Sequence, residues 1–523
     1  MLLLTDVSDE AALVSRGVTW GSVPASWVLV VSSVCSRVYR WSPSRPNGYA
    51  THARTKALDR AGDRCECGRR RGRWPGRCAV TQRGAAVVCG ASMGGLLAAR
   101  VLADFYESVT LVERDVLPEN VTQRRGVPQG RHLHMMLSRG IRIVGELFPG
   151  LTDELAAAGV PVVDGSDASR FYLQVGEHLL CRTGGFTDPA AITMHLASRP
   201  LLETAIRRRV RAIENVTVLD GHDVVGPIMA GDRVHAVRVI DRESGAERTL
   251  DADLTVDATG RAARTPAFLE AHGYERPAEK SYPVGLTYSS QFFRVPPGAI
   301  TERVAAIGPT LERSTGGGLL AYENDTVILT MIGVAGQRLP ADLPGLLEMA
   351  TALLPAEMAA ALRDAEPIDG VSSQHYPAST WRRYDKLRRF PRGFLVLGDA
   401  VCSFNPVYGQ GMASAALQAR ALRDCLAAPA TDDLSRRFYR AAARKLTPIW
   451  QANRMNDFAV TPVTGWRSIP QRALIWQRDK VMAAATDDIR LAEAFVLVLQ
   501  LVAPSSTLFR PSMLMRIIKS SRR

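Results

Sequence analysis

Two short segments of this 523-residue chain combine glycine with an acidic residue at spacings that could serve chemistry. In the first, an apolar run over 85–89 leads into Gly-Ala-Ser-Met-Gly-Gly, and Glu113 follows roughly 20 residues later. Gly90 would let the backbone turn sharply, and Gly95 would let a helix pack closely on a sheet. Free N–H groups at the start of that helix would face a pyrophosphate, and Glu113 would accept hydrogen bonds from ribose hydroxyls. The segment indicates a dinucleotide site, with Ser92 replacing the middle glycine of the usual pattern.

The second segment places an acid and a glycine-rich loop after another apolar run. Residues 393–398 form this run, Asp399 follows it, and the loop 404–411 leads into an alanine-rich helix over 412–426. The carboxylate of Asp399 can fix a hydroxyl group of a polyol. The loop glycines let N–H groups and the positive end of the helix dipole face a ring that bears negative charge. A reduced flavin is such a ring, so this is the most informative segment of the chain.

The elements that position these residues follow from the spacing of apolar side chains. The order strand, glycine turn, helix, strand and acid over 85–115 is that of a βαβ unit. Its helix is indicated by apolar residues that share about one face at the 3.6-residue period, from Leu96 to Phe105. Another apolar strand, 254–257, ends in Asp-Ala-Thr-Gly, a turn that can approach a ligand closely.

A polar loop, 123–134, follows the first unit and leads into a predicted helix over 135–148. Arg125 could supply a cationic donor beside the pyrophosphate, or the loop could simply be solvated, and the sequence leaves both interpretations open. His132 and His134 are the histidines to test for proton handling, and a structural role for either is equally open.

The middle of the chain predicts a second, mostly antiparallel sheet. Strand-like runs flank a hairpin turn near 176, and further runs lie between 283 and 335. Helices are predicted after the N-cap residue Ser198 and over 343–362. Nothing here names a substrate, because the same Phe, Tyr and Ile residues suit an apolar cavity and core packing.

Composition limits the class of protein. Hydrophobic residues make up 46% and charged residues 22%, as in ordinary soluble globular proteins. The net charge is +13, but residues 1–83 hold 14 basic and 6 acidic residues, so the body is only mildly basic and nucleic-acid binding is not indicated. No apolar run approaches the roughly 20 residues of a transmembrane helix. Four scattered cysteines favour free thiols in a reducing compartment, hence the cytoplasm: Cys89, Cys181, Cys402 and Cys425.

The first 83 residues differ from the rest, because no amphipathic period persists in them. The arginine run 69–71 could form a nucleic-acid arm. Three cysteines and a histidine could form a metal knuckle, although the spacing fits no usual zinc pattern: Cys65, Cys67, Cys78 and His52. We favour a disordered extension, or a start assigned too early, with the working protein beginning near Val80.

Three motifs together resemble the FAD-dependent monooxygenases of the p-hydroxybenzoate hydroxylase-like fold. They are the Arg-Gly-Val-Pro-Gln-Gly-Arg-His-Leu-His loop at 125–134, Asp-Ala-Thr-Gly-Arg at 257–261, and Gly-Asp at 398–399 with the loop 405–411. The resemblance covers about residues 83–430 and looks most like the bacterial epoxidase branch, which includes polyether-antibiotic epoxidases and is related to squalene epoxidase.

The resemblance implies an α/β fold with three parts. These are a Rossmann-like FAD-binding domain of the glutathione reductase type, an inserted, mostly antiparallel substrate domain, and a C-terminal helical region. The expected segments are 84–165, 190–270 and 375–430 for the FAD-binding domain, 166–189 and 271–374 for the substrate domain, and 431–523 for the helical region.

The resemblance also implies cofactor-binding roles for individual residues; it names no metal ligand, and the catalytic residues stay unknown. Those on the adenosine and pyrophosphate side would be Gly90, Ser92, Gly95, Glu113 with its neighbour Arg114, Arg125, Arg199 and the backbone of Val224. Asp399 would hold the ribityl chain, and the residues against the isoalloxazine would be Pro406, Gly409, Gln410, Gly411 and Met412.

The implied activity inserts one oxygen atom from O₂ into a small apolar organic metabolite, by epoxidation or hydroxylation through a flavin C4a-hydroperoxide, as in secondary metabolism. NAD(P)H would supply electrons, directly or through a separate flavin reductase. A flavin-dependent reductase of prenyl double bonds and a flavin halogenase are the alternatives. The halogenase is disfavoured because Trp-Arg-Ser-Ile-Pro at 466–470 does not match the Trp-x-Trp-x-Ile-Pro signature.

Overall fold

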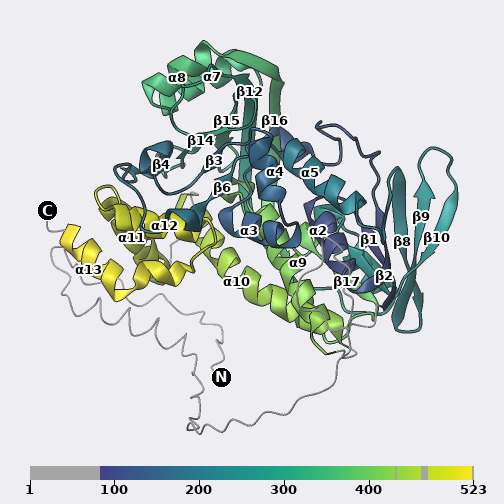
Figure 1. Ribbon diagram of the computed structural model, residues 1–523. Coiled ribbons are helices and arrows are strands. Elements are labelled where there is room, and N and C mark those ends of the chain that lie inside the picture. Colours follow the sequence, from purple (N-terminus) through teal and green to yellow (C-terminus); the bar gives the residue numbers. More distant parts are fainter. Residues whose placement is uncertain (1–82, 430–432, 461–468, 521–523) are drawn as a thin grey trace, which may run out of the picture. The chain divides into compact units, whose positions relative to one another are not determined.

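The computed structural model describes residues 83–429, 433–460 and 469–520 (Figure 1). These residues belong to one compact unit. The expectations for residues 1–82, including the extension, the metal knuckle and the arginine arm, lie outside the described residues.

A five-stranded parallel sheet carries the first glycine segment, in the strand order β17-β11-β1-β2-β7. Val88, Leu111 and Val256 at its centre are fully buried, because layers on both faces exclude water. This burial explains why its strands appear in the sequence as short, continuous apolar runs. The strands are β1 (Arg83–Cys89), β2 (Tyr106–Val112), β7 (Val216–Leu219), β11 (Leu254–Asp257) and β17 (Phe394–Val396).

Helices cover one face of the parallel sheet, and a three-stranded antiparallel sheet covers the other (Figure 1). On the second face, Val87 and Val112 pack against Val237 and Val239. The helices are α2 (Met93–Leu102), α3 (Ser138–Leu147), α4 (Leu151–Ala157), α5 (Arg199–Arg211) and α9 (Gly411–Ala427). The small sheet consists of β8 (His222–Ala230), β9 (Arg233–Asp241) and β10 (Glu247–Asp251).

A second sheet of eight strands has the order β18-β16-β12-β15-β14-β13-β4-β5, and each neighbouring pair is antiparallel except β13 with β4. The edge strand β18 lies just after Asp399, so the flavin motif enters the edge of this sheet. The strands are β4 (Phe171–Val175), β5 (His178–Leu179), β12 (Glu279–Arg294), β13 (Val304–Ile307), β14 (Thr315–Ala321), β15 (Thr326–Gly333), β16 (Glu366–Arg382) and β18 (Cys402–Ser403).

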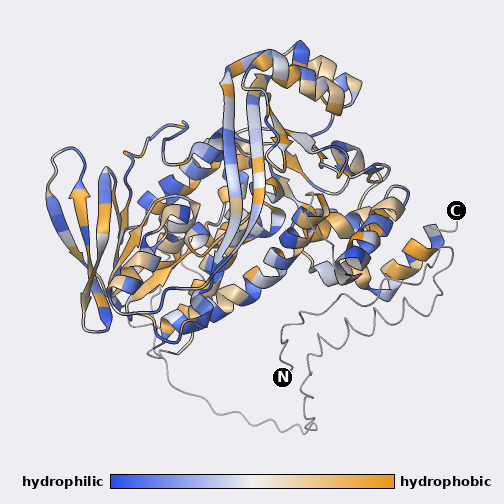
Figure 2. Ribbon diagram, turned by 180° about the vertical axis from the view of Figure 1, so that it is seen from behind, coloured by the Kyte–Doolittle hydropathy of each residue, from blue (hydrophilic) through white to orange (hydrophobic). Residues whose placement is uncertain are grey.

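Two helices cover one face of the eight-stranded sheet. They are α7 (Leu343–Leu353) and α8 (Ala356–Arg363), where the sequence predicts a single helix over 343–362. That prediction is wrong because the ring of Pro355 cannot continue a helix. Much of β16 is only partly covered and carries hydrophilic residues, as Figure 2 shows on the long strands.

The described part of the C-terminal region contains the α-helices α10 (Leu434–Val460), α11 (Ile469–Ala484), α12 (Ile489–Leu499) and α13 (Pro511–Ser520). Helix α10 packs into the core of the parallel sheet through Phe438, Leu446 and Trp450. The last three helices share a core with β4 and β14. Within the described ranges, no helix combines the length and hydropathy needed to cross a bilayer. The α/β fold predicted from the sequence, with a mostly antiparallel second sheet and C-terminal helices, is confirmed.

The close approach of α2 to β1 predicts that Gly95→Ala strongly destabilises the protein. A Cβ atom at Gly95 would overlap the carbonyl oxygen of Gly90, a backbone atom that cannot move aside cheaply. We expect a loss of about 2 kcal/mol or more in the free energy of unfolding, measured by urea denaturation. Gly145→Ala in α3 is the matched control, because its nearest neighbour would lie 3.9 Å away. The control should be neutral or slightly stabilising, and equal effects of the two substitutions would refute this account of the packing.

Candidate functional site

The first glycine turn brings a helix N-terminus to the carboxyl end of β1. Gly90 has a φ of +99°, and a Cβ there would lie 2.7 Å from the carbonyl oxygen of Ala258. Helix α2 begins at Met93, and its N-cap residue Ser92 makes no side-chain capping bond. The first N–H groups of the helix can therefore bind an anion.

The acid at the end of β2 faces this turn. The Glu113 carboxylate accepts hydrogen bonds from the backbone N–H of Ala91 at 2.7 Å and of Asp115 at 3.1 Å. Arg124 lies 3.5 Å from the same carboxylate. Glu113 is buried, so its charge depends on these partners rather than on water. Its role in accepting from ribose hydroxyls stays a prediction.

The arginine that reaches the turn is Arg124, whereas Arg125 is exposed. The Arg124 guanidinium donates to the carbonyl oxygen of Ala91 at 3.2 Å, to Asp115 at 3.0 Å and to Glu203 at 2.6 Å. The sequence selects Arg125 from this pair, and that role stays a prediction. An irregular loop has no period from which the inward-facing member of two adjacent arginines could be read.

Arg199, at the start of α5, lies on the other side of the turn. Ser198 caps this helix by accepting from the N–H of Leu201, as the sequence predicts. The Arg199 guanidinium donates to Ser92 Oγ at 2.9 Å and to Glu203 at 2.8 Å. Burial opposes ionisation of Glu203, but Arg199 and Arg124 outweigh it and lower the pKa of this carboxyl. Glu203 thus holds both cations beside the turn.

Two further residues named from the resemblance lie at the edge of this arrangement. Arg114 is exposed beyond β2, and its carbonyl oxygen accepts from Arg242 at 3.1 Å. Val224 lies on β8, partly buried against the small core between the two sheets. Neither side chain is brought to the glycine turn.

Asp399 is accessible to solvent, although the residues on both sides of it, Gly398 and Ala400, are buried. Burial among surrounding protein atoms raises the pKa of its carboxyl, and the charges of Arg261 and Arg199 oppose this rise. The carboxyl makes no hydrogen bond or ion pair with the described residues. Because it is accessible and has no partner among the described residues, the Asp399 carboxyl is available to a hydroxyl group of a ligand.

The loop after Asp399 presents its backbone toward solvent. Asn405 Oδ1 accepts from the N–H of Val407 at 3.1 Å, and Gly409 adopts a left-handed conformation with φ of +63°. Pro406 and Gly411 are exposed, and α9 begins at Gly411. Gln410 and Met412 are buried and anchor the loop. The helix dipole of α9 therefore points at the surface that this loop forms.

The loop 123–134 joins the nucleotide part to the eight-stranded sheet. His132 Nδ1 lies 2.9 Å from the hydroxyl of Ser290, which lies 2.7 Å from the hydroxyl of Thr330. Its ring meets Tyr288 edge-on, with the centroids 4.3 Å apart. Burial, aided by His134, lowers the pKa of His132 to about 4. Burial also lowers the pKa of His134 to about 4, so both rings are neutral at neutral pH.

Arg261 is a further cation near Asp399, to which the sequence motif assigns no role. Its guanidinium lies over the ring of Tyr376, 4.8 Å from the centroid, and its charge acts on Asp399. Asp257, by contrast, is buried and bonded within its own turn, to the N–H and hydroxyl of Thr259 and to Thr265. Asp257 shapes the turn, whereas the charge of Arg261 acts on Asp399.

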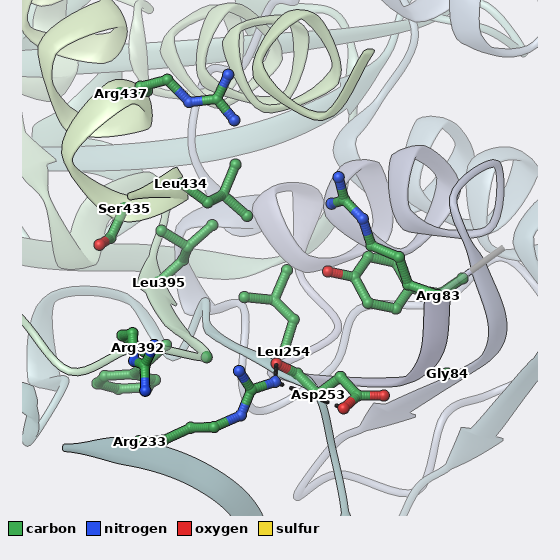
Figure 3. A pocket seen from close by; sticks show the side chains of 13 residues that line it. Arg83, Gly84, Arg233, Asp253, Leu254, Arg392, Leu395, Leu434, Ser435 and Arg437 are labelled. Carbon is green, nitrogen blue, oxygen red and sulfur yellow. Dashed lines mark hydrogen bonds and ion pairs between the residues drawn. The ribbon is translucent and has the colours of Figure 1, made fainter. Parts of the chain in front are cut away.

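A cavity of about 390 Å³ lies at the amino-terminal ends of the parallel strands (Figure 3). It is lined by Arg83, Tyr106, Leu254 and Phe394, which begin four of the parallel strands. Dinucleotides bind at the carboxyl ends of such strands, where the motif residues gather. This cavity is therefore separate from the candidate cofactor site.

Comparison with known proteins identifies the family. Residues 84–456 match the model of the FAD binding domain family. The chain belongs to this family. It is also 42% identical over 428 residues to Protein Rv3254 of Mycobacterium tuberculosis (strain ATCC 25618 / H37Rv), covering 79% of this chain and 88% of that protein. The prediction of an FAD-dependent enzyme is confirmed.

Solved structures with low sequence identity share the fold. The p-nitrophenol 4-monooxygenase PnpA of Pseudomonas putida has a TM-score of 0.58 at 15% identity, covering 81% of this chain and 99% of that one. The flavin-dependent halogenase CmlS has a TM-score of 0.57 at 15% identity, covering 80% and 77%. The fold thus serves more than one flavin chemistry, and the reaction must be argued from the site.

The residues present fit FAD. The turn at Gly90 and Gly95 places the start of α2 directly at the carboxyl end of β1, where N–H groups can bind a pyrophosphate. Arg199 supplies a buried cation, and the accessible carboxylate of Asp399 makes no hydrogen bond or ion pair with the described residues. Within the described ranges, no group of His, Cys, Asp and Glu is arranged to hold a metal ion.

The lowered pKa of His132 predicts that acid destabilises the protein. The unfolded chain binds a proton at this histidine as the pH falls through about 6.5, but the folded chain does so only near 4. Stability should therefore fall between these values, by at most about 1.4 kcal/mol per pH unit from this group. Urea unfolding of His132→Asn across this window should show a shallower dependence on pH. His272→Asn, at an exposed histidine, is the control, and an unchanged slope in His132→Asn would contradict the prediction.

Proposed function

We propose that this protein is an FAD-dependent monooxygenase that inserts one oxygen atom from O₂ into an apolar organic metabolite. The observation that carries the proposal is the accessible yet desolvated carboxyl of Asp399, between Arg199 and the loop that precedes α9. A family match to an FAD binding domain over residues 84–456 supports the cofactor. The similarity of sequence motifs to the bacterial epoxidase branch makes epoxidation the first reaction to test.

In this proposal, residues at the carboxyl ends of the parallel strands bind the cofactor. The N–H groups of α2 and the Arg199 guanidinium hold the pyrophosphate, and Glu113 accepts from ribose hydroxyls. Asp399 accepts from the ribityl chain. The backbone of 406–412 lies along the isoalloxazine ring, where the dipole of α9 stabilises negative charge. When reduced, bound FAD supplies the activation of O₂.

The residues facing the eight-stranded sheet suit an apolar substrate. His132 is neutral, and it packs against the ring of Tyr288. Leu133 and Met135 in the same loop pack against an apolar cluster with Phe292. Apolar side chains at this wall favour an apolar substrate, although the charge of Arg261 acts on Tyr288. In this proposal, a bound apolar substrate would help to exclude water from the reactive oxygen-transfer step.

Electrons would come from NAD(P)H, directly or through a separate flavin reductase. The side chain of Asp257, at the turn that could contact a nicotinamide cofactor, is engaged within its own turn. This arrangement favours delivery by a reductase partner. The cytoplasm remains the proposed location, supported by the free thiols of Cys89, Cys402 and Cys425.

Halogenation is the second candidate, because CmlS shares the fold. The Trp-x-Trp-x-Ile-Pro signature is absent from the sequence, which favours oxygenation. A reductase of prenyl double bonds would use the same cofactor site without O₂.

Removal of the Asp399 carboxyl should weaken FAD binding. We expect Asp399→Ala to raise the dissociation constant roughly 10- to 100-fold, because a charged hydrogen bond contributes about 1.5–3 kcal/mol. Fluorescence titration of apoprotein with FAD measures the change. Asp253→Ala is the matched control, because Asp253 lines the cavity at the amino-terminal ends of the parallel strands. This substitution should leave FAD affinity unchanged. Tight FAD binding by Asp399→Ala would refute the assignment.

Turnover under ¹⁸O₂ distinguishes the three reactions. A monooxygenase should place one ¹⁸O atom in the product for each turnover, detected by mass spectrometry with a panel of apolar alkenes and electron-rich aromatic compounds. A reductase should give saturated product without ¹⁸O, and a halogenase should require added chloride or bromide. Either of the last two results would replace the proposed reaction while keeping the cofactor.

A further inference from the structure

Helix α10 holds the loop 404–411 through a buried polar cluster. Asn405 Nδ2 donates to Asp457 Oδ1 at 2.7 Å, and the Tyr408 hydroxyl donates to the same oxygen at 2.8 Å. One turn earlier on the helix, Asn453 Nδ2 donates to Gln410 Oε1 at 2.7 Å. Asn453 and Asp457 are only 1% and 4% exposed. Three loop residues are thus tied to two helix residues.

The spacing of the two helix residues explains how one helix reaches the whole loop. Asn453 and Asp457 are four residues apart, so they lie on the same face of α10, about one turn from each other. The loop residues between these attachment points, Pro406 and Val407, are exposed. Helix α10 therefore fixes the buried side of the loop while its other side stays open to a ligand.

The hydroxyl of Tyr282 is buried in the same cluster and acts on the Asp457 carboxyl. Burial raises the pKa of Asp457, against the opposing effects of Tyr408, Asn405 and Tyr282. Arg478 of α11 is the nearby cation that acts on Tyr408. A buried carboxyl of this kind is costly, so its persistence at this loop calls for a role.

We propose that Asp457 and Asn453 are positioning residues that set the placement of the loop 404–411 against the flavin. The inference rests on the proposed function, in which this loop lies along the isoalloxazine ring. It assigns the C-terminal helical region a part in holding the cofactor, through Asn405, Tyr408 and Gln410. Asp457 and Asn453 themselves need not touch the flavin.

The test compares FAD binding and the flavin spectrum across variants of the full chain. Asp457→Ala should weaken FAD binding roughly tenfold and change the visible circular dichroism of the bound flavin. Asp457→Asn should restore both, because its amide oxygen can still accept from Asn405 and Tyr408. Asn453→Ala should alter the same spectrum, and it serves if Asp457→Ala does not fold.

Glu493→Ala is the matched control for loss of a buried carboxylate in the C-terminal region. Glu493 of α12 accepts from the N–H and hydroxyl of Thr187, away from the flavin loop. The Glu493→Ala substitution should lower thermal stability without changing FAD affinity or the flavin spectrum. Wild-type FAD affinity and spectrum in Asp457→Ala and Asn453→Ala would overturn the inference alone. A wild-type protein that binds no FAD would overturn the proposed function and this inference together.

Discussion

The close approach of α2 to the turn at Gly90 is the constraint on which the rest of the site depends. No side chain fits between the backbone at Gly90 and that at Gly95, so the helix starts directly at the carboxyl end of β1. Its first N–H groups then lie beside the ends of β2 and β11 as well, because these strands flank β1 in the sheet. The positions of Glu113 and Asp257 follow from this arrangement, because Glu113 comes directly after β2 and Asp257 is the last residue of β11. A larger residue at either glycine would move the helix away from both.

Charge around this turn is balanced within the protein before any ligand arrives. Glu203 pairs with Arg199 and Arg124, and Arg124 also pairs with Asp115 and lies near Glu113. Buried ions require such partners, because removing either sign leaves an uncompensated charge. The network therefore fixes the two arginines beside the glycine turn at a modest net charge. Asp399 is different, because its carboxyl makes no bond to the described residues and can accept from a ligand without breaking one.

Much of this architecture could be predicted from the sequence, for identifiable physical reasons. Strands β1, β2 and β17 are short apolar runs that end in glycine or an acid, and such local patterns fix both the fold and the position of Asp399. The choice between Arg124 and Arg125 could not be made, because a loop has no side-chain period. The break between α7 and α8 could be predicted from Pro355 itself, but the apolar period on both sides of this residue favours one continuous helix. The domain boundaries stay a prediction, although β16 and β18 show that the eight-stranded sheet continues past residue 374.

The contribution of α10 could not be read from sequence for a different reason. Asn453 and Asp457 sit in a helix whose other inward residues, such as Phe438 and Trp450, are ordinary core. Polar residues on the buried face of a helix become meaningful only when their partners are known, and here the partners lie about 50 residues earlier in the loop after Asp399. The same three-dimensional contact joins the loop after Asp399 to the C-terminal helical region. A loop anchored in this way has one exposed surface and one fixed interior. The placement of the loop therefore depends both on its own residues and on the helix that holds them.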